Sequence, residues 1–125
     1  MPSPTAAPPR PLVALAALNG FLAVAGGAFG AHGQSDPRLK ALLQTGAQYE
    51  LAAAAIGLGI AALAAQNLKG AGLSAWLVLT GGLVFGVSLD LIVASGLNMF
   101  GAVTPLGGLL MLAGFAWLGV CALRR

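Results

Sequence analysis

The amino-acid sequence predicts an all-α membrane protein, built as a bundle of four transmembrane helices. Of the 125 residues, 58% are hydrophobic and only 7% are charged, whereas an ordinary soluble domain carries about a quarter charged residues. A soluble fold of this length could not shield so much apolar surface from water. The apolar residues also fall into four long runs separated by short breaks, so lipid is the expected solvent.

The chain is expected to begin with a disordered tail over residues 1–10, which are rich in proline and small residues. A four-helix domain then covers residues 11–125, and its first span runs from about Leu12 to Ala31. A signal peptide is the alternative, since the triplet Ala23-Val24-Ala25 follows an apolar stretch preceded by Arg10. We favour a retained helix, because the apolar run continues beyond the triplet and no soluble domain for export follows it.

The second helix is expected from Pro37 to about Ala65, because Asp36 can cap it and a proline suits its first turn. Such a helix is about 43 Å long, which is more than the roughly 30 Å hydrocarbon core requires. Its start, residues 38–48, is amphipathic, with the leucines on one side and the charged residues and glutamines mostly elsewhere. We therefore expect an interfacial start, with the membrane-buried part beginning near Gly46.

The second half of the chain supplies two further spans. A polar turn over residues 66–72 precedes a third span from about Leu73 to Ser95, and an uncharged loop is expected over residues 96–103. Thr104 is expected to cap the fourth helix, which begins at Pro105 and ends near Leu123. Four spans bring both termini to the same side of the membrane.

The distribution of basic residues predicts that both termini face the cytoplasm. The side that holds both tails and the second loop has four basic residues, and the other side has two. An excess of basic residues marks the cytoplasmic side. Because most of them flank apolar runs, they are interface charges, and no nucleic-acid partner is expected. The first group is Arg10, Lys69, Arg124 and Arg125, and the second is Arg38 and Lys40.

Four local strings are similar to those of a known family of small membrane proteins. They are GAFGAHG at residues 27–33, QTGAQY at 44–49, FGVSL at 85–89 and TPLGG at 104–108. In this order and spacing, the chain resembles the bacterial YgdD-like inner-membrane proteins, an uncharacterised four-helix family with eukaryotic transmembrane-protein relatives. The resemblance covers most of the chain after Arg10. It implies four transmembrane helices and a location in the bacterial inner membrane, with no established activity or cofactor.

The chain also departs from the pattern of that family. Family members often have a histidine a few residues beyond the tyrosine of the second helix, where this chain has Ala52 and Ala53. They often have an aromatic residue at the place of Asp90. A role that depends on the histidine is therefore not carried over to this chain.

No catalytic, cofactor or metal motif is present, so we expect neither an enzyme nor a bound cofactor. The sequence has no cysteine pair, no HExxH motif and no glycine-rich phosphate loop with a following lysine. Its glycines fit helix packing instead, because small residues let helices approach closely in lipid. Asn19, inside the first span, is expected to bond between helices. The glycines at GxxxG spacing are Gly26 with Gly30, and Gly82 with Gly86.

Glu50 and Asp90 are the strongest functional candidates, because both are carboxylates inside apolar spans. An ionised carboxylate at the bilayer centre costs about 2.5 to 3.5 kcal/mol on insertion scales, so such residues usually face the bundle interior or water. Counting at 1.5 Å per residue from Gly46 and from Ser95 places each acid about 6 to 8 Å inside the same boundary. We expect an intramembrane polar site on the non-cytoplasmic side. Its members are Glu50, Asp90, His32, Tyr49 and Thr104.

Alternative interpretations exist for the two acids and for His32. Glu50 and Asp90 could both be hydrated separately near the interface, without sharing a site. His32 is best interpreted as an interfacial polar residue at a helix end, with a titrating group or a metal ligand as the alternative. Because no second histidine or cysteine lies nearby in the sequence, no metal site is expected.

These features favour a non-enzymatic membrane protein with a structural or accessory role through helix packing. The alternative is a small proton or cation transporter, or a channel component, that uses Glu50 and Asp90. An intramembrane enzyme is the least supported class, because no nucleophile is paired with a base. The expected partners are the lipid bilayer and either a second copy of the chain or another membrane protein.

Overall fold

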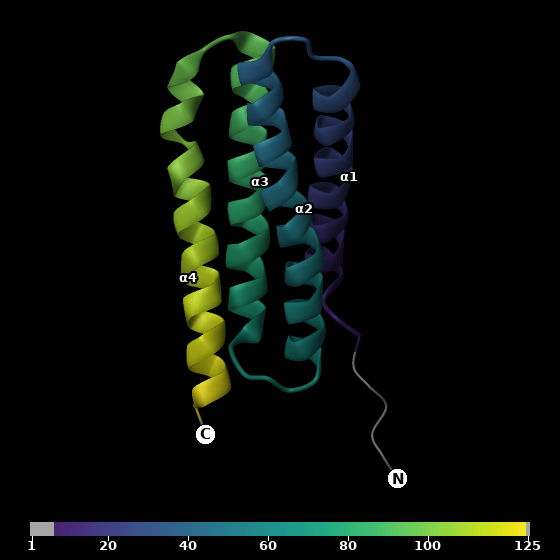
Figure 1. Ribbon diagram of the computed structural model, residues 1–125. Coiled ribbons are helices and arrows are strands. Elements are labelled where there is room, and N and C mark those ends of the chain that lie inside the picture. Colours follow the sequence, from purple (N-terminus) through teal and green to yellow (C-terminus); the bar gives the residue numbers. More distant parts are fainter. Residues whose placement is uncertain (1–6, 125) are drawn as a thin grey trace.

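Four long helices and one short 3-10 helix form the part of the chain that the computed structural model describes, residues 7–124. The long helices run alternately up and down, and the described chain starts and finishes at the same end of the bundle (Figure 1). All four are long and apolar enough to cross a membrane, which confirms the predicted fold. The elements are α1 (Arg10–His32), α2 (Pro37–Ala65), α3 (Ala71–Ser95), η1 (Asn98–Ala102) and α4 (Thr104–Leu123).

The bundle has two distinct ends, a termini end and a loop end. The termini end contains the start of α1, the α2–α3 turn and the end of α4 (Figure 1). The loop end contains the α1–α2 and α3–α4 connections. The tail expected over residues 1–10 is described only from residue 7, since residues 1–6 and Arg125 lie outside the described part.

Local sequence signals account for the ends of α2 and α3. The Oδ1 atom of Asp36 accepts hydrogen bonds from the backbone N–H groups of Arg38 at 2.8 Å and Leu39 at 3.4 Å, which confirms the predicted cap of α2. Gly70 and Gly96 flank α3 with φ angles of 86° and 72°. Glycine adopts this left-handed conformation without the steric cost that other residues meet.

The connection between α3 and α4 differs from the prediction in two respects. Residues 98–102 form a 3-10 helix where a loop was expected. The predicted capping role of Thr104 was wrong, because Thr104 is already helical and its Oγ1 shares a 2.6 Å hydrogen bond with Oγ of Ser88 on α3. In apolar surroundings two hydroxyl groups satisfy each other across a helix interface. The helix start is closed by backbone instead, with the Leu106 N–H donating to the carbonyl of Val103.

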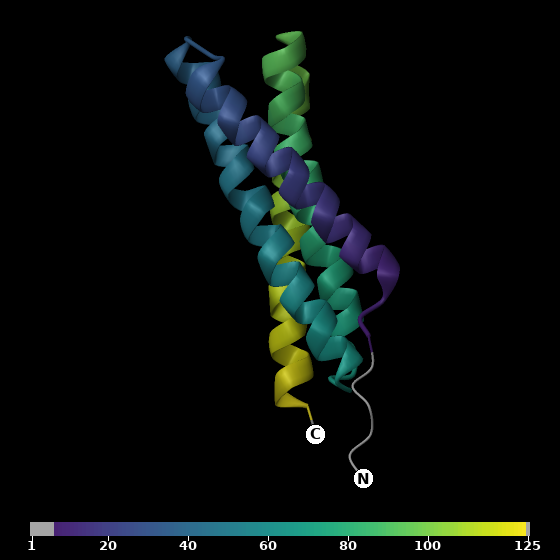
Figure 2. The ribbon, with the colours of Figure 1, turned by 90° about the vertical axis from the view of Figure 1, so that its right-hand side faces the viewer.

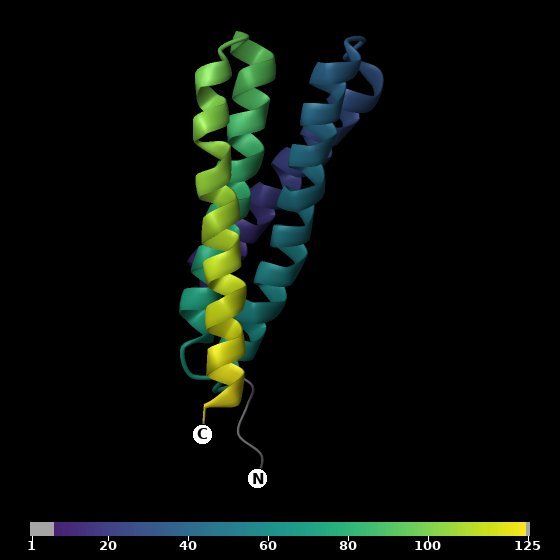
Figure 3. The same cartoon turned by 60° about the vertical axis from the view of Figure 1, so that its left-hand side comes forward.

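The helices associate as two pairs that meet along α3. α3 packs extensively against α2 and α4 and also touches α1, whereas α4 packs mainly against α3. Figures 2 and 3 show that α1 and α2 lean together and diverge from α3 and α4 toward the loop end. The two pairs therefore lie closer together at the termini end than at the loop end.

The apolar core occupies the half of the bundle nearer the termini end. Its residues come from the first half of α1, the second half of α2, the first half of α3 and the middle of α4. Small side chains dominate it, so the backbones lie close together. The members of this apolar core are Leu12, Ala16, Ala53, Ile60, Ala61, Ala71, Ala75, Val78, Leu79 and Met111.

Candidate functional site

Glu50 is buried at the interface between α2 and α3, with a side chain that is 1% exposed. Its carboxyl group lies against Gly86, where an added methyl group would come within 2.6 Å of Cδ of Glu50. The helices approach closely here because Gly46 on α2 also faces Gly86. A methyl group added to Gly46 would lie 3.5 Å from the Cα atom of Gly86. Oε2 of Glu50 has no hydrogen-bond partner among the described residues. Glu50 therefore carries a buried oxygen that accepts no hydrogen bond from the described residues.

Asp90 lies one helical turn beyond Gly86 on α3 and faces α1. A methyl group added to Gly26 would lie 3.3 Å from Oδ1 of Asp90. The aspartate is half-buried. It lines a pocket of 430 Å³ between α1, α2 and α3 at the loop end, called the loop-end pocket below. The lining residues are Gly26, Phe29, Gln34, Leu43, Asp90, Val93 and Ala94.

Asn19 adds a third polar group, one turn deeper toward the apolar core. It is 0% exposed, and its Nδ2 donates hydrogen bonds to the carbonyl oxygens of Leu15 at 3.0 Å and Leu79 at 3.1 Å. The second bond joins α1 to α3, which confirms the expected bond between helices. Oδ1 of Asn19 has no partner among the described residues and faces Gly82, where an added methyl group would lie 3.2 Å away.

Asn19, Glu50 and Asp90 thus follow one another along the inner face of α3, at Gly82, Gly86 and Asp90 itself. These three positions on α3 are one turn apart, a rise of about 6 Å each. We call these three residues the polar column. It extends from the loop-end pocket down to the apolar core, and it contains two buried acceptor oxygens without a donor.

The other three residues of the predicted polar site are directed elsewhere. His32 is exposed at the end of α1. Tyr49 is half-exposed, and its ring packs against Phe85 with 4.8 Å between the ring centroids. Thr104 is bonded to Ser88 on the side of α3 that faces α4. Of the five candidates, Glu50 and Asp90 belong to the polar column.

All four glycines that the sequence assigned to helix packing lie at close approaches between helices. A methyl group on Gly30 would lie 3.0 Å from Cβ of Leu43, and one on Gly82 would overlap Cβ of Ala53. Gly26 and Gly86 have a different role, because the groups that face them are the carboxyl groups of Asp90 and Glu50. These two glycines therefore make room for the acids as well as for neighbouring helices.

One close backbone approach between α3 and α4, at Gly81 and Gly107, was not predicted from the sequence. A methyl group on Gly107 would lie 2.6 Å from the carbonyl oxygen of Gly81, and one on Gly81 would lie 2.8 Å from the backbone nitrogen of Met111. Both glycines stand beside a second glycine, Gly82 or Gly108. Spacing alone does not show which glycine of such a pair faces the neighbouring helix.

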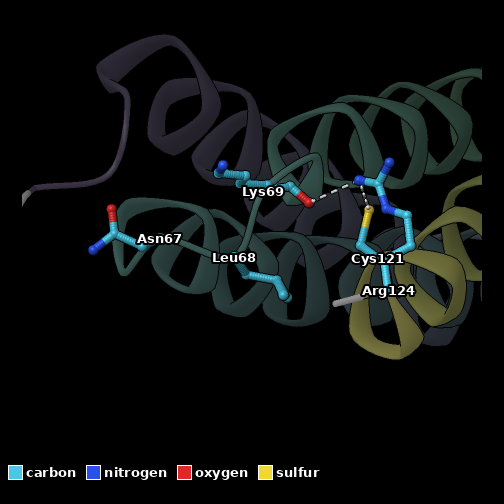
Figure 4. A pocket seen from close by; sticks show the side chains of 5 residues that line it. All are labelled: Asn67, Leu68, Lys69, Cys121 and Arg124. Carbon is cyan, nitrogen blue, oxygen red and sulfur yellow. Dashed lines mark hydrogen bonds between the residues drawn. The ribbon is translucent and has the colours of Figure 1, made fainter.

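At the termini end, the last turn of α4 is tied to the α2–α3 turn. Nε1 of Trp117 donates a 2.9 Å hydrogen bond to the carbonyl oxygen of Gly70. Nη2 of Arg124 donates to the carbonyl oxygen of Lys69 at 3.4 Å, and its guanidinium lies 5.1 Å from the centre of the Trp117 ring. Figure 4 shows the Lys69 side chain pointing away from Arg124. The surrounding 410 Å³ pocket is lined by Asn67, Leu68, Lys69, Cys121 and Arg124.

This arrangement is best interpreted as an anchor. Nη2 of Arg124 already donates to the Lys69 carbonyl oxygen of the turn and to Sγ of Cys121. Tryptophan with arginine is typical of a membrane interface, where one part of each side chain is apolar and the other is hydrated. The polar column therefore remains the stronger candidate for a functional site.

Fold and site together define a small polytopic membrane protein with carboxyl groups buried between its helices. Within the described residues, no group of three or more His, Cys, Asp or Glu side chains could hold a metal ion. The chain belongs to the family described as protein of unknown function (DUF423), whose profile matches residues 26–108.

Several bacterial relatives are similar over nearly the whole chain. The UPF0382 membrane protein YwdK of Bacillus subtilis (strain 168) is 36% identical over 118 residues, which cover 90% of this chain and 95% of the relative. The UPF0382 inner membrane protein YgdD of Escherichia coli (strain K12) is 36% identical over 120 residues, or 92% and 91% of the two chains. No solved structure matches the chain.

These matches confirm the predicted relation to the YgdD-like proteins and the predicted membrane location. The names of the relatives give a location and no activity. The chain is therefore an integral membrane protein whose biochemical role has to be argued from its own residues.

Proposed function

We propose that the protein is a non-catalytic membrane protein that acts through helix association, in a structural or accessory role. The observation that supports this is an open face on α4. Added methyl groups at Gly108 and Gly119 would meet no atom within 4 Å. Leu112 and Phe115, which lie between them at helical spacing, are 66% and 41% exposed. Small residues flanked by large apolar ones are typical of helix interfaces in lipid.

The open face of α4 borders an apolar groove of 530 Å³, which is lined by residues of α2, α3 and α4. Lipid tails are as apolar as leucine, so a partner helix would be held here by close packing and not by the hydrophobic effect. We propose that the partner is a second copy of the chain, because one helix face can pair with itself about a twofold axis. The groove is lined by Tyr49, Phe85, Pro105, Gly108, Leu109, Met111, Leu112 and Phe115.

Disulfide cross-linking in native membranes tests this function. Cys121 is the chain's single cysteine and is buried, so Cys121→Ser provides a cysteine-free background. In that background Gly119→Cys is expected to give a covalent dimer under mild oxidation, because the two α4 helices would meet at this position. Val24→Cys, at a 63% exposed position on α1, is the matched control and is expected to remain monomeric. Absence of a dimer at Gly119, or equal dimer yields at both positions, would contradict the proposal.

We also propose that the protein lies in the bacterial inner membrane with both termini in the cytoplasm. Four basic residues against two support this orientation. Reporters fused after Arg125 and within residues 66–72 are therefore expected to give cytoplasmic signals, and a reporter within residues 96–103 an external one. A cytoplasmic signal from residues 96–103 would reverse the orientation.

A further inference from the structure

We propose that the polar column of Asn19, Glu50 and Asp90 is an intramembrane proton-binding site, entered from the loop end and closed toward the termini end. This inference goes beyond helix association and does not depend on the α4 interface. It rests on the burial of Glu50, on the unpaired oxygens of Glu50 and Asn19, and on the position of Asp90 in the loop-end pocket.

No basic side chain faces Glu50 from the helices packed against it. α1 has no titratable side chain between Arg10 and His32, and α3 has only Asp90. On α2 itself, the nearest basic residue toward the loop end is Lys40, about 15 Å away along the helix. An ionised carboxylate buried without a counter-charge costs several kcal/mol. A bound proton removes that cost by neutralising the group.

The remaining titratable groups near this level are directed away from Glu50. Tyr49, the preceding residue on α2, packs against Phe85. α4 packs mainly against α3, and its titratable residues Cys121 and Arg124 lie at the termini end. Asp90 is thus the one ionisable side chain on a packed helix near this level, one turn along α3 from the glycine that Glu50 faces.

The loop-end pocket provides the route of entry. Asp90 lines this pocket together with Gln34 from the α1–α2 connection. Figure 3 shows the two helix pairs diverging toward the same end of the bundle. A proton from the loop end therefore reaches Asp90 first and Glu50 one turn deeper, by transfer from one carboxyl oxygen to the other directly or through water.

Toward the termini end the column stops at Asn19. The next residues inward on α3 are 0% exposed: Ala75, Val78 and Leu79 belong to the apolar core, and beside them lies one polar residue, Ser74, whose Oγ has no partner among the described residues. Within residues 7–124, this core separates the column from the termini end. A proton that enters from the loop end therefore leaves by the same end, and a single chain binds protons without conducting them.

The geometry favours a proton over a metal ion. A hard divalent cation such as Ca²⁺ takes about six to eight oxygen ligands, whereas the column has two unpaired buried oxygens. Glu50 is also pressed against Gly86, which leaves no space for an ion on that side. A protonated Glu50 needs one acceptor for its O–H group, and Oδ1 of Asn19 on the adjacent turn is an acceptor without a donor.

Infrared spectroscopy of the full chain in liposomes tests the site, because the chain has only three acidic side chains. At neutral pH the wild type is expected to show the carbonyl band of a protonated carboxyl group. The band should be lost in Glu50→Gln and kept in Asp36→Asn, the control at the exposed cap of α2. Absence of the band in the wild type, or its persistence in a folded Glu50→Gln variant, would overturn the proposal.

A second measurement keeps Glu50 in place and tests the route. Ala94→Phe would fill the loop-end pocket. It should slow hydrogen–deuterium exchange of the protonated carboxyl group, followed by the shift of its carbonyl band, by about tenfold, which corresponds to about 1.4 kcal/mol in the activation free energy of exchange. Leu63→Phe, at a 45% exposed position near the termini end of α2 and outside that pocket, should leave the exchange rate unchanged. Equal rates in both variants would overturn entry through the pocket. Proton flux across wild-type liposomes would overturn the closed termini end, and its absence would support it.

Discussion

Gly107→Ala is expected to lower the free energy of unfolding by about 2 to 4 kcal/mol, because it overfills the closest contact between α3 and α4. The new methyl group would lie 2.6 Å from the carbonyl oxygen of Gly81 and 2.9 Å from Cα of Phe85. Both are backbone atoms, so no side-chain rotation can relieve the overlap, and α4 would have to move away from α3. Thermal unfolding in mild detergent measures the effect.

Gly59→Ala is the matched control for this prediction. It adds the same methyl group to a glycine in the interior of α2, where no atom lies within 4 Å. Alanine in a helix interior is favoured over glycine by about 0.5 to 1 kcal/mol, so the control is expected to be as stable as the wild type or slightly more stable. Equal destabilisation by the two variants would show that the α3–α4 contact is not governed by Gly107.

Gly86→Leu is expected to have the second large effect, by separating α2 from α3 and displacing Glu50. A single methyl group at this position would already come within 2.6 Å of Cδ of Glu50. Leu91→Ala, on the same helix at a 40% exposed position, is expected to cost less than about 1 kcal/mol, since its side chain faces lipid and not the helix interface. Detergent stability of the two variants gives the comparison, and equal loss in both would contradict a close α2–α3 crossing.

A double variant shows whether the Gly86→Leu effect acts through Glu50. Glu50→Ala removes the carboxyl group that the new leucine would meet, so Gly86→Leu with Glu50→Ala is expected to be more stable than Gly86→Leu alone. Residues in contact give non-additive effects of about 0.5 to 3 kcal/mol in such a cycle. Additive effects would mean that the leucine is resisted by backbone packing with Gly46 and not by the glutamate.

The helix ends were predictable because the signals for them are local. Asp36 followed by Pro37 predicted the start of α2, and the structure places it there. The apolar runs likewise predicted all four spans to within a few residues. The connection after α3 was less predictable, because the hydroxyl of Thr104 bonds to Ser88, which is 16 residues away in the sequence. Its position in space depends on how α3 and α4 pack.

The composition of the candidate site was not fully predictable. Counting residues from the span ends predicted similar levels for Glu50 and Asp90, and in the structure Glu50 faces Gly86, one turn from Asp90 along α3. The direction of Tyr49 was not predictable from its neighbour Glu50, because adjacent residues point about 100° apart on a helix. One faces the α4 side and the other the interior.

The sequence by itself therefore determined the number and length of the helices and most of their ends, because each depends on residues within a turn or two of one another. The tertiary structure alone decided which glycine of each adjacent pair meets a neighbour, that Asn19 joins the acids, and that the two helix pairs diverge toward the loop end. These features depend on the rotation and tilt of each helix. In lipid the outward faces are as apolar as the inward ones, so the hydrophobic pattern does not distinguish them. The contacts between segments that are distant in the sequence show which face of each helix points inward.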